Sequence, residues 1–140
     1  MAQVAIVTGG TRGIGAAISS SLIESGFIVA ASYGGDHDSA KAFSERSGAS
    51  VYQWDVADFE ACADGVARAE QDLGPIAVLI NNAGITRDGT LQKMTPERWQ
   101  QVIQTNLSSC FNMCHAVIGG MREREYGRIV NIGSINGQAG

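Results

Sequence analysis

Residues 8–15 read Thr-Gly-Gly-Thr-Arg-Gly-Ile-Gly and separate a short apolar run, Val4–Val7, from a segment with helical periodicity. In that segment Ile14, Ile18 and Leu22 recur every four residues, the spacing of one helix face. Glycines allow a sharp turn and a close approach to a phosphate, and a helix start offers free N–H groups to an anion. The spacing is G-x-x-x-G-x-G rather than the commoner G-x-G-x-x-G. Its place between a strand and a helix nevertheless predicts a dinucleotide-binding turn.

A tight turn without a ligand is the alternative for this stretch. A phosphate loop of the nucleotidase type would need a lysine after its last glycine, and none follows here. The residues of the turn that we expect to contact a nucleotide are Gly9, Thr11, Arg12, Gly13, Ile14 and Gly15.

Arg12 indicates which nucleotide this would be. A cation at a helix N-terminus is unfavourable by about 0.3–1 kcal/mol, unless an anionic ligand lies there. The end of the second predicted strand, Ala31-Ser32-Tyr33-Gly34, also lacks the Asp or Glu that grips the ribose 2′-hydroxyl in NAD sites. Both features favour NADP(H) over NAD(H), with Tyr33 among the contacts. A solvated surface charge is the alternative for Arg12.

Strand-like and helical patterns alternate along the rest of the chain. Further apolar runs predict strands at Phe27–Ala31, Val51–Trp54, Ile76–Ile80 and Ile129–Ile132, and helical patterns cover 38–47, 58–73 and a long stretch from Thr95-Pro96-Glu97 to about Arg124. Strands that are apolar throughout indicate a parallel sheet covered on both faces. We therefore predict an α/β fold with a Rossmann-like, doubly wound parallel sheet, in a single dinucleotide-binding domain over residues 1–140.

Composition narrows the classes of partner. The chain has 140 residues and a net charge of −4, so it has no basic footprint for nucleic acid. No apolar run approaches the ~20 residues of a membrane span, and the N-terminus lacks the charged start of a signal peptide, so we expect a cytoplasmic protein. Three cysteines without framework spacing fit reduced thiols. Cys110, Cys114 and His115 have no evident fourth ligand, so we predict no metal site.

Two later stretches follow predicted strands, at the sheet edge where ligands bind in this architecture. Asp55 and Val56 come after the third strand, where Asp55 could bind an adenine amino group or cap a turn. Asn81-Asn82-Ala83-Gly84 ends the fourth strand, and its small residues and amides leave room for a cofactor.

Two polar residues suggest chemistry at the same edge. Asn106 interrupts the apolar face of the long helix between Ile103 and Leu107, and a buried amide there must bind water, backbone or a catalytic group. Ser134 lies just past the fifth strand, where a hydroxyl could polarise a substrate carbonyl. A lone serine in a loop is more often a turn residue.

Together these motifs resemble the classical short-chain dehydrogenase/reductase family. TGGTRGIG at 8–15 matches the family's cofactor loop, NNAG at 81–84 its fourth-strand motif, Thr105-Asn106 its helix asparagine and NIGS at 131–134 its catalytic serine. The resemblance implies that Ser134 orients the substrate carbonyl and that Asn106 holds a water in a proton relay. It also implies cofactor contacts at Asn82, Ala83, Gly84 and Ile85.

Finer details resemble the acetoacetyl-CoA reductases of that family. The similar stretches are 82–88, 93–96, 111–113 and above all Ser134-Ile135-Asn136-Gly137-Gln138. This implies NADPH-dependent reduction of acetoacetyl-CoA to (3R)-3-hydroxybutanoyl-CoA in polyhydroxybutyrate synthesis, with Asp88 and Gln138 as substrate contacts in a homotetramer. Relatives that act on 3-oxoacyl groups of acyl carrier protein share N-A-G-I-T-R-D but typically lack S-I-N-G-Q, and they are one alternative. A non-catalytic dinucleotide-binding module is another.

The family's catalytic Tyr-x-x-x-Lys has no match in the chain. Four residues after Tyr33, Tyr52 and Tyr126 stand a histidine and two valines. We therefore expect this motif to lie beyond Gly140, the sheet to be truncated after about five strands, and the 140-residue chain alone to be inactive.

Overall fold

Five parallel strands form one sheet in the computed structural model, which describes residues 1–139. The strands are β1 (Val4–Val7), β2 (Ile28–Tyr33), β3 (Ser50–Gln53), β4 (Ile76–Asn81) and β5 (Arg128–Asn131). Their order is β3-β2-β1-β4-β5, so the chain returns across the sheet after β3 and places β4 beside β1. The predicted α/β fold with a parallel sheet is confirmed, and its topological switch point lies between β1 and β4.

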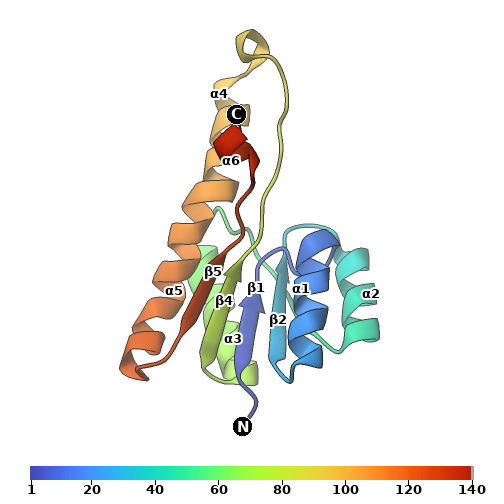
Figure 1. Cartoon of the computed structure of the whole chain (residues 1–140), viewed down its shortest axis with the longest axis vertical. Coiled ribbons are helices and arrows are strands. Elements are labelled where there is room, and N and C mark those ends of the chain that lie inside the picture. Colours follow the sequence, from blue (N-terminus) through green and yellow to red (C-terminus); the bar gives the residue numbers. More distant parts are fainter. Residues whose placement is uncertain (140) are drawn as a thin grey trace.

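Helices cover both faces of this sheet (Figure 1). They are α1 (Gly13–Glu24), α2 (His37–Ser47), α3 (Phe59–Leu73), α4 (Pro96–Ile103), α5 (Ser109–Glu123) and the short α6 (Asn136–Ala139), with a 3₁₀ turn η1 at Leu91–Lys93 and a π-helical segment η2 at Gln104–Ser108. Apolar residues of α1 and α2 pack with one side of the strands, and those of α3 and α5 pack with the other. Two apolar cores therefore hold the strand ends in place.

Polar side chains begin three of the helices. Asp36, Asp58 and Thr95 are the N-caps of α2, α3 and α4, and each side chain accepts a hydrogen bond from a backbone N–H of the first turn. The predicted start of a helix at Thr95-Pro96 is confirmed. In α1 the N-cap is Arg12, whose side chain makes no such bond.

The structure corrects the long helix expected from Thr95 to about Arg124. The π-helical segment η2 divides it into α4 and α5, and the wider turns of this segment rotate the apolar stripe between its two halves. Leu107, Phe111 and Ile118, which the periodicity placed on its apolar face, are exposed rather than packed on the sheet. The strand predicted at Phe27–Ala31 also extends to Tyr33, because its ladder with β3 continues to the end of that strand.

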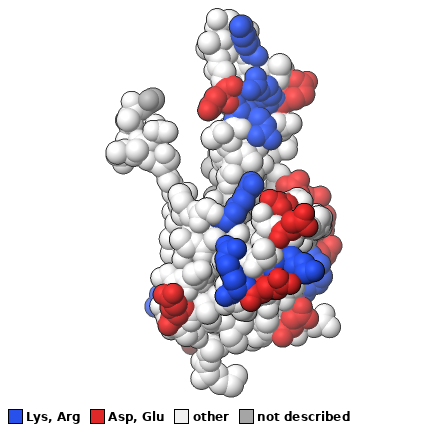
Figure 2. Space-filling view, turned by 90° about the vertical axis from the view of Figure 1, so that its right-hand side faces the viewer, with Lys and Arg blue, Asp and Glu red and all other residues white. Residues whose placement is uncertain are grey.

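The distribution of surface charge and the length of the helices concern two expectations from the sequence, on nucleic acid and on membrane. Basic and acidic side chains are interspersed on the face shown in Figure 2, without a continuous basic surface there. Within residues 1–139 no helix is long and apolar enough to span a bilayer.

Two helical glycines provide a test of the packing between α3 and the sheet. A Cβ at Gly65 would overlap the ring of Trp54, whereas a Cβ at Gly119 of α5 meets open space. We expect Gly65→Ala to lower the free energy of unfolding by about 1–3 kcal/mol through overpacking. Gly119→Ala should raise it by about 0.5–1 kcal/mol, because alanine loses less backbone entropy in a helix. Urea denaturation measures both changes, and equal shifts in the two variants would contradict this packing.

Candidate functional site

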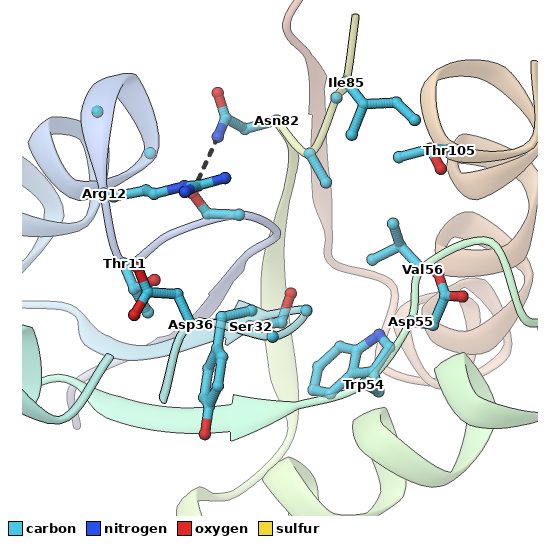
Figure 3. A pocket seen from close by; sticks show the side chains of 18 of the residues that line it. Thr11, Arg12, Ser32, Asp36, Trp54, Asp55, Val56, Asn82, Ile85 and Thr105 are labelled. Atoms are coloured by element: carbon cyan, nitrogen blue, oxygen red, sulfur yellow. Dashed lines mark hydrogen bonds between the residues drawn. The ribbon is translucent and has the colours of Figure 1, made fainter. Parts of the chain in front are cut away.

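A cleft of about 800 Å³ opens at the carboxyl ends of the strands (Figure 3). Each residue predicted to contact a nucleotide lines it: Gly9, Thr11, Arg12, Gly13, Ile14, Gly15, Tyr33, Asp55, Val56, Asn82, Ala83, Gly84 and Ile85. The sequence analysis missed Ser32, Gly34, Gly35, Asp36, Trp54, Arg87, Gln101 and Thr105, which line the cleft too. The structure thus brings the three predicted stretches to one site, whose size suits a small organic ligand.

The glycine turn leaves backbone exposed to this cleft. Gly9 and Gly13 have φ values of +59° and +55°, in the left-handed region that favours glycine. A Cβ at Gly15 would overlap the carbonyl of Gly9, so only glycine fits there. The first turn of α1 has neither a side-chain cap nor an acidic residue. Its N–H groups therefore remain available to an anion in the cleft.

The Thr8 hydroxyl and the Asn82 amide fix this turn against the end of β4. Thr8 Oγ1 accepts hydrogen bonds from the backbone N–H groups of Asn82 and Ala83, both at 3.0 Å, and lies 3.4 Å from the Ile80 carbonyl. Asn82 Nδ2 donates to the carbonyls of Thr8 at 3.1 Å and Gly9 at 3.3 Å. Asn82 lines the cleft, and its amide nitrogen also holds the loop.

Asp36 brings a carboxylate to the cleft that the sequence analysis did not anticipate. It lies three residues past β2 and stands on the same side of the cleft as Arg12 (Figure 3). Its two oxygens accept from the backbone N–H and the hydroxyl of Ser39 at 3.0 and 2.8 Å, and these bonds hold its pKa below the usual range. Arg12 lowers that pKa further through its charge. Asp36 is therefore ionised at neutral pH.

A buried amide on α5 supports the wall that follows β3. Asn112 Nδ2 donates to the Val56 carbonyl at 3.0 Å, and the buried Cys62 thiol lies 3.4 Å from the same oxygen. Burial raises the pKa of Cys62 to about 11, so this thiol stays protonated. Asp55 Oδ1 accepts from the Ala57 N–H at 2.9 Å, which is the turn role left open by the sequence. An asparagine on an apolar helix face was the available signal for Asn112.

Asn106 pairs with backbone, but the prediction that its amide is buried is wrong. Asn106 lies in the π-helical segment and is exposed. Its Oδ1 accepts from the Ile85 N–H at 2.7 Å, and its Nδ2 donates to the Ile85 carbonyl at 2.9 Å. The π-helical segment turns the side chain away from the sheet, so the amide holds the strand-like stretch after Gly84 instead.

The predicted catalytic serine and substrate contacts lie outside the residues that line the cleft. Ser134 Oγ accepts from the Asn136 N–H at 3.1 Å, and within residues 1–139 no hydrogen bond joins it to Asn106. Asp88 uses its carbonyl to bind Arg98, and Gln138 is an exposed residue of α6. Their roles stay predictions.

An amide pair anchors the strand that leads to Ser134. Asn81 Nδ2, at the end of β4, donates to Asn131 Oδ1, at the end of β5, at 2.9 Å. It also lies 3.6 Å from Cys114 Sγ.

In the part of the chain that the structure describes, no three His, Cys, Asp or Glu side chains gather as a metal site would require.

Comparison with known proteins places this cleft in context. A family model described as short chain dehydrogenase matches residues 3–140. The chain is 62% identical over 138 residues to an acetoacetyl-CoA reductase of Paracoccus denitrificans, covering 99% of this chain and 57% of the relative. It is 60% identical over 140 residues to one of Shinella zoogloeoides, covering 100% and 58%. A 3-oxoacyl-[acyl-carrier-protein] reductase of Vibrio harveyi is 40% identical over 143 residues, covering 99% and 57%.

Substitutions at Asn106 and Asn112 test whether each of these side chains supports only one wall of the cleft. Asn106→Ala removes both bonds to Ile85, so we expect faster amide hydrogen exchange at Ile85 and little change at residues 55–58. Asn112→Ala removes the donor to the Val56 carbonyl and should give the opposite pattern. Hydrogen-exchange mass spectrometry or NMR measures both. Faster exchange in both segments of either variant would show that the two amides do not act locally.

Proposed function

The chain belongs to the short chain dehydrogenase family, and from this premise we propose that it forms the NADPH-binding part of an acetoacetyl-CoA reductase. The whole protein would reduce acetoacetyl-CoA to (3R)-3-hydroxybutanoyl-CoA in polyhydroxybutyrate synthesis. The chain spans about 57–58% of the length of the acetoacetyl-CoA reductases named above. The observation that carries the proposal is the cleft, in which a glycine turn and an uncapped helix start face the ends of β2, β3 and β4.

The residues of the cleft fit a nicotinamide dinucleotide. The α1 N-terminus would supply N–H groups for a pyrophosphate, and the absence of a Cβ at Gly15 lets the glycine turn pack closely against this helix start. Arg12 would pair with a 2′-phosphate, and Asp55 and Val56 would contact the adenine. When bound, the nicotinamide supplies a hydride to the ketone carbon.

The remaining residues would act on the substrate. The Ser134 hydroxyl orients and stabilises the carbonyl oxygen, and Asn106 holds a water in the proton relay. In the chain as it stands the Asn106 amide bonds to both backbone polar groups of Ile85, which joins η2 to the cleft wall. Asp88 and Gln138 would contact the acyl-CoA. We further propose that the whole protein is a cytoplasmic homotetramer.

Two other functions have weaker support. The resemblance to 3-oxoacyl-[acyl-carrier-protein] reductases is lower, at 40% identity against 62% for the acetoacetyl-CoA reductase of Paracoccus denitrificans. A non-catalytic dinucleotide-binding module would retain the cleft but need no Ser134.

The proposed substrate is tested with the protein encoded by the complete reading frame. We expect the coding DNA to continue in frame beyond codon 140 and to encode Tyr-x-x-x-Lys. The purified product should oxidise NADPH faster with acetoacetyl-CoA than with acetoacetyl-acyl carrier protein, and Ser134→Ala should slow this about 100-fold or more. The reverse substrate preference would favour the carrier-protein reductase. Absence of the motif would favour the non-catalytic module.

The cofactor preference is tested on the chain itself. We expect Arg12→Ala to raise the Kd for NADPH about tenfold, the loss of roughly 1.4 kcal/mol of charge-assisted hydrogen bonding, and to change the Kd for NADH by less than about twofold. Asp36→Asn keeps the acceptor for the cap of α2 and removes a negative charge from the cleft, so it should tighten NADPH. Calorimetry measures both constants.

Arg122→Ala is the matched control for these variants, because Arg122 lies in the last turn of α5 and does not line the cleft. It should leave both constants unchanged. Equal losses of NADPH and NADH affinity in Arg12→Ala would contradict a 2′-phosphate contact.

A further inference from the structure

Asn136 differs in two ways from the other asparagines of the chain. It is followed by a glycine, and within residues 1–139 its side chain makes no hydrogen bond. Each of the others is followed by a residue with a side chain and pairs its own carboxamide with another group: Asn81, Asn82, Asn106, Asn112 and Asn131. A paired carboxamide is held in one orientation, whereas that of Asn136 can rotate.

The segment around Asn136 is open to water. All of residues 130–139 are exposed, and Ile135 is 77% exposed. A Cβ at Gly137 would meet no atom within 4 Å. Figure 1 shows this segment beyond the carboxyl end of β5, where it leads into α6. Water therefore reaches both the Asn136 side chain and the peptide group that follows it.

The helix α6 gives this peptide group little protection. It comprises only Asn136–Ala139, and the Gly137 N–H donates to the Ser134 carbonyl at 3.1 Å. A helix of one turn is marginal in water, because its first hydrogen bond must fix several residues. Glycine adds further backbone freedom. The Gly137 nitrogen is therefore released from this bond by local opening.

We infer that Asn136–Gly137 is a site of spontaneous deamidation, which converts the Asn136 amide into a carboxylate. The backbone nitrogen of Gly137 attacks Asn136 Cγ, and the two atoms form a bond. The bond from Cγ to Nδ2 breaks, and Nδ2 leaves as ammonia with the proton of the attacking N–H. Water then opens the cyclic imide at either carbonyl, which gives aspartate or isoaspartate. No oxidant or reductant takes part.

The place of the new charge relates this modification to the proposed function, on which this second step rests. Ser134 Oγ accepts from the Asn136 N–H at 3.1 Å, so the modified residue adjoins the proposed catalytic hydroxyl. A carboxylate there repels an acyl-CoA, which carries phosphate groups. Isoaspartate also lengthens the backbone ahead of Gln138, a proposed substrate contact. Deamidation should therefore slow the reductase as the protein ages.

The modification itself is tested on the chain. Trypsin cleaves after Arg128, so residues 129–140 form one peptide that contains both Asn131 and Asn136. After the folded chain is incubated in mildly alkaline buffer, we expect tandem mass spectrometry to find an acid at 136 and an unchanged amide at 131. Asn131 is the internal control, because it is also exposed but pairs with Asn81 and precedes Ile132.

Two alanine variants test the part played by glycine. Gly137→Ala should slow the conversion of Asn136 about tenfold or more, because a side chain hinders the attack and restricts the backbone. Gly119→Ala is the matched control, since a Cβ there also meets open space, and it should leave the rate of conversion unchanged. Retention of the amide at 136, or conversion of Asn131 at the same rate, would overturn the inference.

The effect on the reaction is tested with the protein encoded by the complete reading frame. We expect kcat/KM for acetoacetyl-CoA to fall about fivefold or more as the deamidated fraction approaches one. Asn136→Asp should show a similar loss before any incubation. Gly137→Ala, compared with its own starting rate, should lose little over the same period. Full conversion without loss of rate would overturn the effect on the reaction and leave the modification site in place.

The two measurements separate this inference from the proposed function. If the fresh protein does not reduce acetoacetyl-CoA, the proposed function falls, and mass spectrometry still decides whether Asn136 is deamidated. If Asn136 keeps its amide while the fresh protein is active, deamidation is overturned and the proposed function stands.

Discussion

The Thr8 hydroxyl connects the ends of β1 and β4, the two strands between which the order of the sheet reverses. It accepts from two consecutive backbone N–H groups, and Asn82 returns hydrogen bonds to the two carbonyls around Gly9. A buried hydroxyl with fixed partners allows little freedom to either strand end. The glycine turn, the start of α1 and the segment after β4 therefore have defined positions relative to one another.

Beyond the strands, the walls of the cleft are loops with no sheet partner of their own. Asparagine side chains provide the missing partners: Asn106 pairs with both polar groups of Ile85, and Asn112 donates to the Val56 carbonyl. A carboxamide carries a donor and an acceptor on one rigid plane, so it can replace a neighbouring peptide group. Both asparagines come from the helical region η2–α5, on the face of the sheet opposite α1. This region thus positions loops that follow two different strands.

Charge at the cleft is more balanced than the sequence suggested. The sequence indicated that no acidic residue stands at the end of β2, and none does as far as Tyr33. Asp36 nevertheless reaches the same cleft after the turn at Gly34 and Gly35. Whether a carboxylate three residues beyond a strand points to the site depends on the path of that turn, and residue types alone do not define it. Its hydrogen bonds to Ser39 also show that the same side chain begins α2.

The segments whose structure could be predicted are those with a repeating local pattern. Continuous apolar runs predicted all five strands, and a capping threonine followed by proline predicted the start of α4. The π-helical segment was not predictable, because apolar residues continue through 103–111 at ordinary helical spacing. The exposure of Asn106 was mispredicted for the same reason, since one widened turn changes which face a residue occupies.

The sequence by itself determined an alternating α/β chain, a glycine turn after its first strand and the residues of that turn that line the cleft. Each of these depends on neighbours within a few positions, through side-chain periodicity and the conformational freedom of glycine. Only the tertiary structure decided that Arg12 shares the cleft with Asp36 and that Asn112 supports Val56. Those relations join segments far apart in the chain, so they follow from how helices and strands pack rather than from any local pattern.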